Sequence, residues 1–180
     1  MPLGKQKVFG IGFHKTGTKT LGQALTTLGY RVKGPFGAQD PDIAKVALRR
    51  ALEIARSYDA FNDNPWAILF KDLDANFPGS KFILTRRAED RWLRSQIRYF
   101  GAKSTPMREW IYGVGSPLGN EDVYLRRYRQ HNAAVLSYFC RRPDDLLIMD
   151  FERKDGWAQL CGFLRANRPC VPFPHANPTL

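Results

Sequence analysis

The residues best suited to chemistry lie near the start of the chain, in the stretch Gly-Ile-Gly-Phe-His-Lys-Thr-Gly-Thr-Lys-Thr. Gly12 and Gly17 have the glycine spacing of a phosphate-binding loop, whose backbone N–H groups surround a phosphate. In loops that bind nucleoside triphosphates, a lysine directly follows the second glycine. Here Thr18 takes that place, and the lysines are Lys15 and Lys19. The displaced lysine predicts an anion-binding loop and argues against an ATP-dependent enzyme.

The segments on either side of this loop predict the structure that positions it. Residues 7–13 form a short apolar run typical of a buried strand, and residues 17–28 have apolar side chains at helical spacing. A strand that leads through a turn into a helix brings the N–H groups of residues 15–20 to a helix N-terminus, which favours an anion. The alternative is a glycine-rich turn that binds no ligand.

A second basic segment follows the apolar run 81–85. This run predicts a strand that ends at Arg87, followed by a helix over 88–100 that carries Ser95. Ligands of open parallel sheets bind beyond the carboxyl ends of the strands, so Arg87 and Ser95 are placed to hold one phosphate. The alternative is an exposed basic helix face with paired charges, comprising Arg86, Arg87, Arg91, Arg94, Arg98, Glu89 and Asp90.

The net charge of +11 is concentrated in these two segments. Residues 1–39 contain six Lys or Arg and no acidic residue, and residues 81–98 contain six more against two acids. Such a distribution favours an anionic ligand held between the two segments. The sequence has no helix-turn-helix, zinc-finger, RNA-binding aromatic strand or basic-tail pattern, so we do not expect a nucleic-acid partner.

Strand-like and helix-like segments alternate along the chain. This alternation predicts a three-layer α/β/α fold with a central parallel sheet, in one domain over residues 1–180. The predicted strands cover 7–13, 57–62, 81–85 and 146–151, and the predicted helices cover 17–28, 41–56, 66–76, 88–100, 120–141 and 155–165. Residues 101–119 read as a loop or a broken helix, and 169–180 as an irregular tail.

Composition excludes several protein classes. No apolar stretch has the roughly 20 residues of a membrane span, and the first residues lead into a strand rather than a signal peptide. The sequence therefore predicts a soluble, cytoplasmic protein without a membrane partner. Three cysteines without C-x-x-C spacing indicate neither a disulfide framework nor a zinc site. We expect no metal.

The two basic segments together resemble the sulfotransferase superfamily, which uses 3′-phosphoadenosine-5′-phosphosulfate (PAPS) as sulfuryl donor. Members carry a lysine two residues before the loop glycine, as in Lys15-Thr16-Gly17-Thr18. They also carry an arginine eight positions before a serine, the spacing of Arg87 and Ser95. The resemblance implies a fold like that of P-loop NTPases.

Further motifs resemble one branch of P-loop sulfotransferases and extend the similarity over nearly the whole chain. These are Asp63-Asn64-Pro65, Arg87 with Trp92, Gly156-Trp157, Leu160-Cys161 and Pro172-Phe173-Pro174-His175. Two positions depart from the pattern. Lys19 stands where a small hydroxyl residue is usual, and Ala88-Glu89 replaces a frequent Asp-Pro or Asn-Pro.

The resemblance implies a role for each basic segment. Lys15 would neutralise the departing phosphate, and Arg87 with Ser95 would hold the 3′-phosphate. Tyr128 and Phe151 are the candidates for contact with adenine. The residues expected to bind the 5′-phosphosulfate are Lys15, Thr16, Gly17, Thr18, Lys19 and Thr20.

An acceptor hydroxyl also needs a general base. Asp63 is the preferred candidate because it follows a predicted strand and matches the aspartate of the related branch. It could instead serve only as a helix N-cap. The other candidates are Asp59, His14, His131 and His175.

The sequence thus predicts a sulfotransferase that moves a sulfuryl group from PAPS to a hydroxyl, or less readily to an amine. The alternatives are a P-loop kinase that uses ATP and Mg²⁺, and a non-catalytic nucleotide- or nucleic-acid-binding protein. Acceptor specificity is expected from the segment around 30–45, from 101–119 and from the pocket above Asp63. The expected acceptor is a small, partly apolar molecule, because several aromatic residues fall in or near these segments. These are Phe36, Trp66, Tyr99, Trp110 and Tyr112. Nothing in the sequence indicates the oligomeric state.

Overall fold

The computed structural model describes residues 6–176 and contains a five-stranded sheet. The strands lie in the order β2-β3-β1-β4-β5, and every neighbouring pair is parallel. Their bounds are β1 Val8–Gly10, β2 Val32–Lys33, β3 Ala60–Asn62, β4 Lys81–Thr85 and β5 Leu146–Met149. The predicted α/β fold with a central parallel sheet is confirmed.

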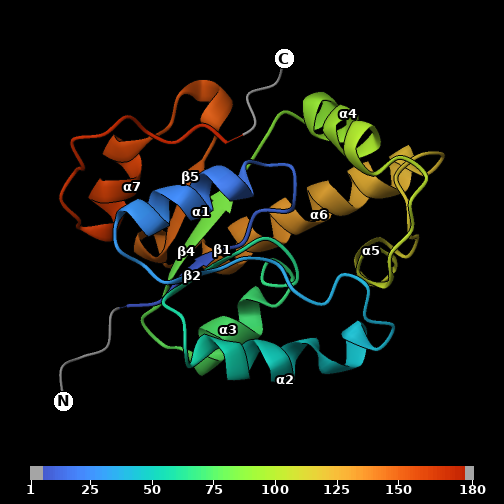
Figure 1. The fold of residues 1–180 in the computed structure, drawn as a ribbon, viewed down its shortest axis with the longest axis horizontal. Coiled ribbons are helices and arrows are strands. Elements are labelled where there is room, and N and C mark those ends of the chain that lie inside the picture. The colour runs from blue at the N-terminus through green and yellow to red at the C-terminus, as the bar shows by residue number, and fades with distance from the viewer. Residues whose placement is uncertain (1–5, 177–180) are drawn as a thin grey trace.

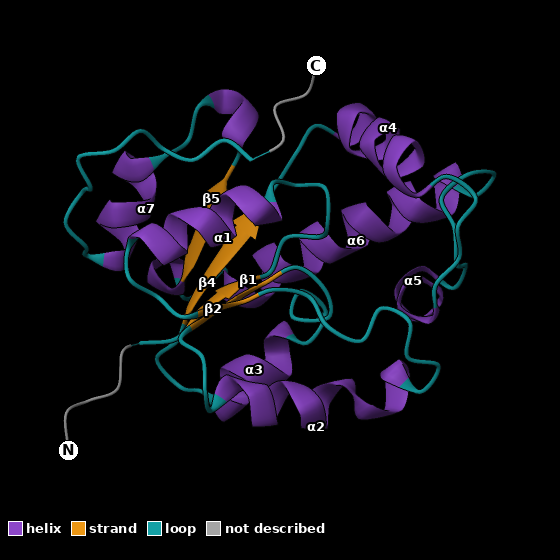
Figure 2. Cartoon of the chain, viewed as in Figure 1, coloured by secondary structure: helices purple, strands orange, loops and turns teal. Residues whose placement is uncertain are grey.

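Helices cover both faces of this sheet (Figures 1 and 2). On one face, α1 and α7 share an apolar cluster with the strands, and on the other face α2, α3, α4, α5 and α6 share a second cluster. The helices are α1 Thr18–Thr27, α2 Ile43–Ala55, α3 Phe70–Asn76, α4 Glu89–Phe100, α5 Pro106–Tyr112, α6 Glu121–Phe139 and α7 Trp157–Leu164. Two short 3₁₀ turns flank β5, namely η1 Pro143–Asp145 and η2 Phe151–Arg153.

The strands build both clusters because successive side chains of a strand point to opposite faces. Phe9 and Phe61 stack at 4.8 Å between ring centroids on the face of α2 and α6. Their neighbours Val8 and Ala60 are also completely buried but belong to the cluster of α1 and α7. Burial on both faces explains why these strands read as continuous apolar runs in the sequence.

Two elements, β2 and α3, differ from the sequence prediction, and α5 decides between the loop and the broken helix that were left open for 101–119. Strand β2 was not predicted, because a strand of two residues has no readable period. Helix α5 lies inside the segment 101–119, where Thr105 caps it by accepting a hydrogen bond from the N–H of Arg108 at 3.2 Å. Helix α3 begins at Phe70 instead of residue 66, because the residues before it form turns.

The sheet order places the ends of β1 and β4 side by side at the centre of the molecule. From β1 the chain first adds β3 and β2 on one side, and later β4 and β5 on the other. Such a reversal of strand order opens a crevice beyond the carboxyl ends of the strands, where ligands of α/β folds bind. The loop after β1 and the arginines after β4 both lie at this edge.

Candidate active site

The loop between β1 and α1 is held in shape by two threonines. The Thr16 hydroxyl donates to the carbonyl of Phe13 and lies 2.6 Å from the hydroxyl of Thr85, at the end of β4. A Cβ atom on Gly12 would lie 2.0 Å from that Thr85 hydroxyl, so only glycine fits there. The predicted strand, turn and helix are therefore present, and Gly17 at φ 95° precedes α1.

Lys15 has a left-handed backbone, with φ 69°, and its ammonium lies 3.8 Å from the centre of the Tyr99 ring on α4. Burial lowers the pKa of Lys15, and repulsion from Lys19, Arg87 and Arg98 lowers it further. Positive charges from the loop and from the second basic segment therefore meet around this lysine. Several cations close to one another are typical of a site that binds an anion.

Asp63 follows β3 and also has a left-handed backbone, with φ 72°. Its carboxylate accepts hydrogen bonds of 2.8 Å from the Thr18 hydroxyl and from the N–H of Asn64. Burial raises the pKa of Asp63, although these two bonds and the charges of Lys15 and Lys19 oppose the rise. Asp63 is not the N-cap of α3, which is Leu69.

Arg87 and Ser95 line one pocket of about 630 Å³ at the same edge of the sheet. The two predicted phosphate-binding residues are therefore brought together, on the segment after β4 and on α4. The remaining lining residues are Arg91, Arg94, Ile97, Arg98 and Glu152. The expected exposed charge pairs are present too, since Arg94 donates to Asp90 at 2.7 Å, but the basic face of α4 also forms a pocket wall.

Tyr128 of α6 holds the backbone of Arg87 from behind the pocket. Its hydroxyl accepts from the N–H of Arg87 at 3.0 Å and donates to the carbonyl of the same residue at 2.9 Å. The ring is 1% exposed and stacks on Trp92 at 4.2 Å between centroids. Contact between Tyr128 and adenine stays a prediction, but the arrangement shows directly that Tyr128 positions Arg87.

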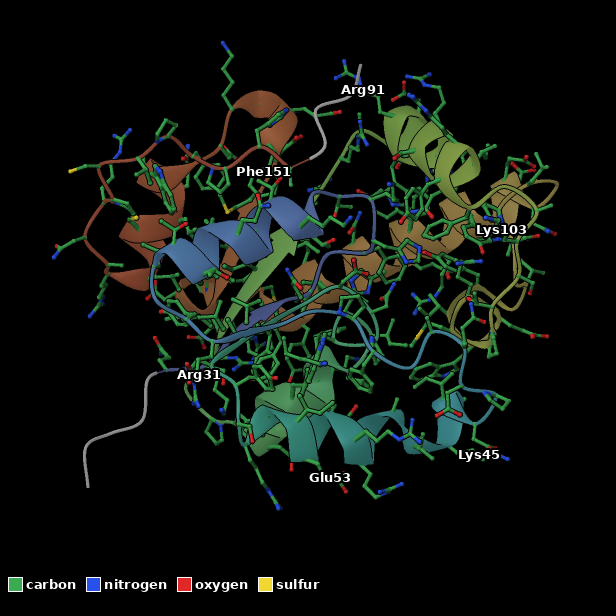
Figure 3. All side chains as sticks on the ribbon, viewed as in Figure 1. Arg31, Lys45, Glu53, Arg91, Lys103 and Phe151 are labelled. Carbon is green, nitrogen blue, oxygen red and sulfur yellow. The ribbon has the colours of Figure 1, made fainter. Side chains whose placement is uncertain are left out.

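Phe151 of η2 joins the end of β5 to the phosphate loop. A Cβ atom on Gly17 would lie 2.4 Å from its ring, so the ring packs closely on this glycine. Figure 3 shows Phe151 next to α1 and Arg91 on α4 at the same end of the molecule. At this end the Thr20 hydroxyl also accepts from the N–H of Ala176, in the C-terminal tail, at 3.1 Å.

His14 is buried and neutral, which makes it a poor general base. Its ring bonds Asn64 through Nδ1 and Tyr112 through Nε2, both at 2.8 Å. Burial, together with the charges of Arg108 and Lys15, lowers the pKa of His14 to about 3. The histidine joins the loop to the turn after Asp63 and to α5.

The other candidate bases lie in unsuitable places. His131 is buried, donates to the carbonyl of Ile11 at 2.7 Å and stacks on Phe13. Asp59 pairs with Arg31 before β3 begins, at the opposite end of the strand from Asp63. His175 lies exposed in the tail. Asp63 is therefore the candidate base that the structure places beside Lys15 and the loop.

Sequence analysis missed Glu152 and Gln96, and it named Tyr99 only as an aromatic residue near the acceptor, without its contact to Lys15. Glu152 pairs with Arg87 at 2.9 Å inside the pocket, and Tyr99 lies against Lys15. Gln96 donates to the carbonyl of His14 at 3.0 Å and so ties α4 to the loop. For Glu152 a signal existed, because it follows β5 at the carboxyl edge of the sheet. The other two required the packing of α4 on the loop.

Within residues 6–176, no group of three or more His, Cys, Asp or Glu side chains is arranged to hold a metal ion. In the same part of the chain, no helix is both long and apolar enough to cross a membrane.

Comparison with known proteins identifies the family. The profile of the sulfotransferase domain matches residues 7–119 and residues 104–179, so the matches reach from the first strand to the tail. A search of curated proteins found no match. The profile covers far more than half of the chain, and the α/β fold with its parallel sheet agrees with it. The chain belongs to the sulfotransferase domain family.

Proposed function

We propose that this sulfotransferase takes the sulfuryl group from PAPS and transfers it to a hydroxyl of a small molecule, or less readily to an amine. The observation that carries the proposal is the shared pocket of Arg87 and Ser95 beside the phosphate loop. PAPS has phosphate groups at two separate positions, and the chain offers two separate basic places at one edge of its sheet. A nucleoside triphosphate, in contrast, carries its phosphates at one position and needs only one basic place.

The residues present fit this donor. The pocket of about 630 Å³ lies within the range of roughly 300–1,000 Å³ usual for ligand sites. Arg87 and Ser95 would hold the 3′-phosphate, and the N–H groups and hydroxyls of residues 15–20 would hold the 5′ end. When bound, PAPS supplies a sulfuryl group on a phosphate leaving group. The lowered pKa of Lys15 reflects surrounding positive charge that such a ligand would neutralise.

Lys15 would stabilise the charge that grows on the departing phosphate. The left-handed backbone of Lys15 and the contact of its ammonium with Tyr99 hold this side chain beside the loop. A fixed cation at a developing negative charge lowers the barrier without reorganisation of solvent. Lys19 is exposed and adjacent, and would add a second contact to the same end of the donor.

Asp63 would accept the proton of the acceptor hydroxyl. A carboxylate with an ordinary pKa is a weak base at neutral pH, and burial raises the pKa of Asp63 toward the useful range. The Thr18 hydroxyl and the N–H of Asn64 fix the carboxylate in one orientation. Asp63 would thus act on the attacking hydroxyl, and Lys15 on the departing phosphate.

Among the aromatic residues expected near the acceptor, Tyr99 is the most accessible. It is 61% exposed and already contacts Lys15. Trp66 and Tyr112 are buried in the core, where they shape the site from behind. An acceptor with a flat or apolar part would pack on Tyr99 while its hydroxyl faces Asp63.

A thermal-shift experiment with three ligands tests the proposed donor. Adenosine 3′,5′-bisphosphate should raise the melting temperature by roughly 5–10 °C at about 100 times its Kd, because binding to the folded state alone is stabilising. ATP with Mg²⁺ and a short oligonucleotide should have smaller effects. Stabilisation by ATP and Mg²⁺ but not by the bisphosphate would contradict the proposal and favour a kinase, and stabilisation by the oligonucleotide alone would favour a nucleic-acid-binding protein.

A further inference from the structure

Glu152 places a negative charge inside the pocket that we assign to a phosphate. Its carboxylate accepts from Nε of Arg87 at 2.9 Å and lies 3.3 Å from the guanidinium of Arg91. The side chains of Arg87 and Glu152 are 17% and 27% exposed, so solvent only partly screens this pair. One carboxylate thus bridges the arginine of the proposed 3′-phosphate site and a second arginine of the same pocket.

The backbone that carries Glu152 is fixed on the phosphate loop. The Asp150 side chain accepts from the N–H of Glu152 at 3.0 Å, which begins the turn η2. The preceding residue, Phe151, packs on Gly17 and lies 5.7 Å from Phe173 between ring centroids. The side chain of Glu152 can therefore change rotamer while its backbone stays in place beside the pocket.

A phosphate at Arg87 and the carboxylate of Glu152 compete for the same guanidinium. Two anions within ion-pair distance of one arginine repel each other, and the repulsion is largest where water is partly excluded. A dianionic phosphate interacts with Arg87 and Arg91 more strongly than a single carboxylate does. A nucleotide that lacks this phosphate forms no interaction with Arg87 that would compensate for loss of the Arg87–Glu152 ion pair.

We propose that Glu152 is a charge filter: it pairs with Arg87 and Arg91 in the empty pocket, and only a ligand with a 3′-phosphate displaces it. This inference rests on the proposed function, because it assumes that the pocket holds the 3′-phosphate of the donor. Glu152 weakens binding of every anion at this position. It also prevents smaller anions from occupying Arg87, and so makes the pocket selective for a doubly charged group.

Calorimetric titration of the full chain with two nucleotides tests this filter. Adenosine 3′,5′-bisphosphate and adenosine 5′-monophosphate differ only in the 3′-phosphate. Glu152→Gln keeps the size and polarity of the side chain and removes its charge, so we expect roughly tenfold tighter binding of the bisphosphate. Binding of the monophosphate should change less than about twofold, since it does not meet Arg87.

Asp90→Asn is the matched control. It also removes one carboxylate paired with a pocket arginine, Arg94, but Asp90 itself does not line the pocket. This control should change bisphosphate affinity less than about twofold. Equal gains in both variants would overturn the filter in favour of a general charge effect, and an equal gain for both nucleotides would overturn its link to the 3′-phosphate.

Two further outcomes separate this inference from the proposed function. Unchanged or weaker binding of the bisphosphate by Glu152→Gln would overturn the filter while leaving the donor assignment intact, because Glu152 would then only orient Arg87. Failure of the unaltered protein to bind the bisphosphate would contradict the donor assignment itself, and the filter would fall with it.

Discussion

Two non-glycine residues of the proposed active site have a backbone conformation that costs free energy. Lys15 and Asp63 lie at φ 69° and 72°, in the left-handed region, which is disfavoured for residues with a Cβ atom. Such conformations cost about 1–3 kcal/mol and persist where surrounding contacts enforce them, often at functional sites. Here the enforcing contacts include the bonds of Thr18 and Asn64 to the Asp63 carboxylate.

Asp63→Asn should abolish transfer and leave donor binding intact. Asparagine tolerates the left-handed region and can keep one of the two hydrogen bonds, so the fold should survive. Loss of a general base lowers the rate roughly 100- to 10,000-fold. Turnover with labelled PAPS and calorimetry with adenosine 3′,5′-bisphosphate would measure the two effects separately.

Asp59→Asn is the control for this prediction, because Asp59 lies at the other end of β3 and pairs with Arg31. It should retain activity, with a small loss of stability. The pH dependence gives a second check: activity of the unaltered enzyme should fall as the pH drops through the raised pKa of Asp63. An active Asp63→Asn variant would contradict this role of Asp63 and would mean that another residue or the acceptor itself supplies the base.

At the level of single residues, contiguous motifs could be predicted and isolated side chains could not. Lys15 was recognised by its place in a glycine-rich stretch, and Arg87 with Ser95 by a fixed spacing along the chain. Glu152 belongs to no such pattern, and Tyr99 was expected near the acceptor but not against Lys15. They reach the site through the packing of η2 on Gly17 and of α4 on the loop, which no local sequence window contains.

Among the elements, α4 is joined to the phosphate loop by two side-chain hydrogen bonds. Trp92 and Gln96, one turn apart on this helix, both donate to the carbonyl of His14 at 3.0 Å. The same helix carries Ser95 and forms the arginine wall of the pocket. The loop and the second basic segment are therefore held as one unit before any ligand binds.

Helix α6 completes this unit through Tyr128, which allows a direct test. Tyr128→Phe keeps the ring that stacks on Trp92 but removes the hydroxyl that bonds the N–H and carbonyl of Arg87. We expect roughly three- to tenfold weaker binding of adenosine 3′,5′-bisphosphate and about 1 kcal/mol less stability, since buried hydrogen bonds are lost. Calorimetry and urea unfolding measure these two effects.

The control is Tyr124→Phe, one turn earlier on α6, whose hydroxyl contacts the carbonyl of Val114 at 3.5 Å and the side chain of Arg108. It should change bisphosphate affinity little. Adenosine 5′-monophosphate separates two roles for Tyr128. Positioning of Arg87 predicts a loss for the bisphosphate alone, whereas equal losses for both nucleotides would instead support the predicted contact with adenine.

Helices and strands were predicted correctly where the segment is long enough to show a hydrophobic period, and less well where it is too short. Strand β4 was predicted with the bounds that the structure shows, because four consecutive apolar or β-favouring residues follow Lys81. Strand β2 has two residues and shows no period, whereas α5 has seven within a segment rich in glycine and proline, where the sequence left loop and broken helix open. The turns before α3 contain apolar residues that are buried against the sheet, which made them resemble a longer helix.

For the whole molecule, the order of the strands explains how distant segments form one site. The phosphate loop, Asp63, Arg87 and Glu152 follow four different strands, and parallel pairing brings the carboxyl ends of those strands to one edge. The sequence predicted a parallel sheet, and ligands of such sheets bind at this edge. The order of the strands was not predicted, and without it the neighbours of each loop could not be assigned.

Two buried histidines make the stability of the whole fold depend on pH. Burial, as the largest cause, lowers the pKa of His14 to about 3 and that of His131 to about 4, from an ordinary value of 6.5. Between each folded pKa and 6.5, the unfolded chain binds a proton at that histidine and the folded chain does not. The free energy of unfolding must therefore decrease as the pH falls below 6.5, until each folded pKa is passed.

Acidification from pH 6.5 to 4.5 should thus cost about 2 kcal/mol for each of these histidines, in addition to any contribution from carboxylates. Urea unfolding at several pH values measures the slope. His131→Gln retains a donor for the carbonyl of Ile11 but does not titrate, so it should remove about 2 kcal/mol of the pH dependence even if it lowers stability at pH 7. A slope identical to that of the unaltered protein would mean that His131 titrates in the folded state as it does in the unfolded chain, and would contradict the effect of burial on its pKa.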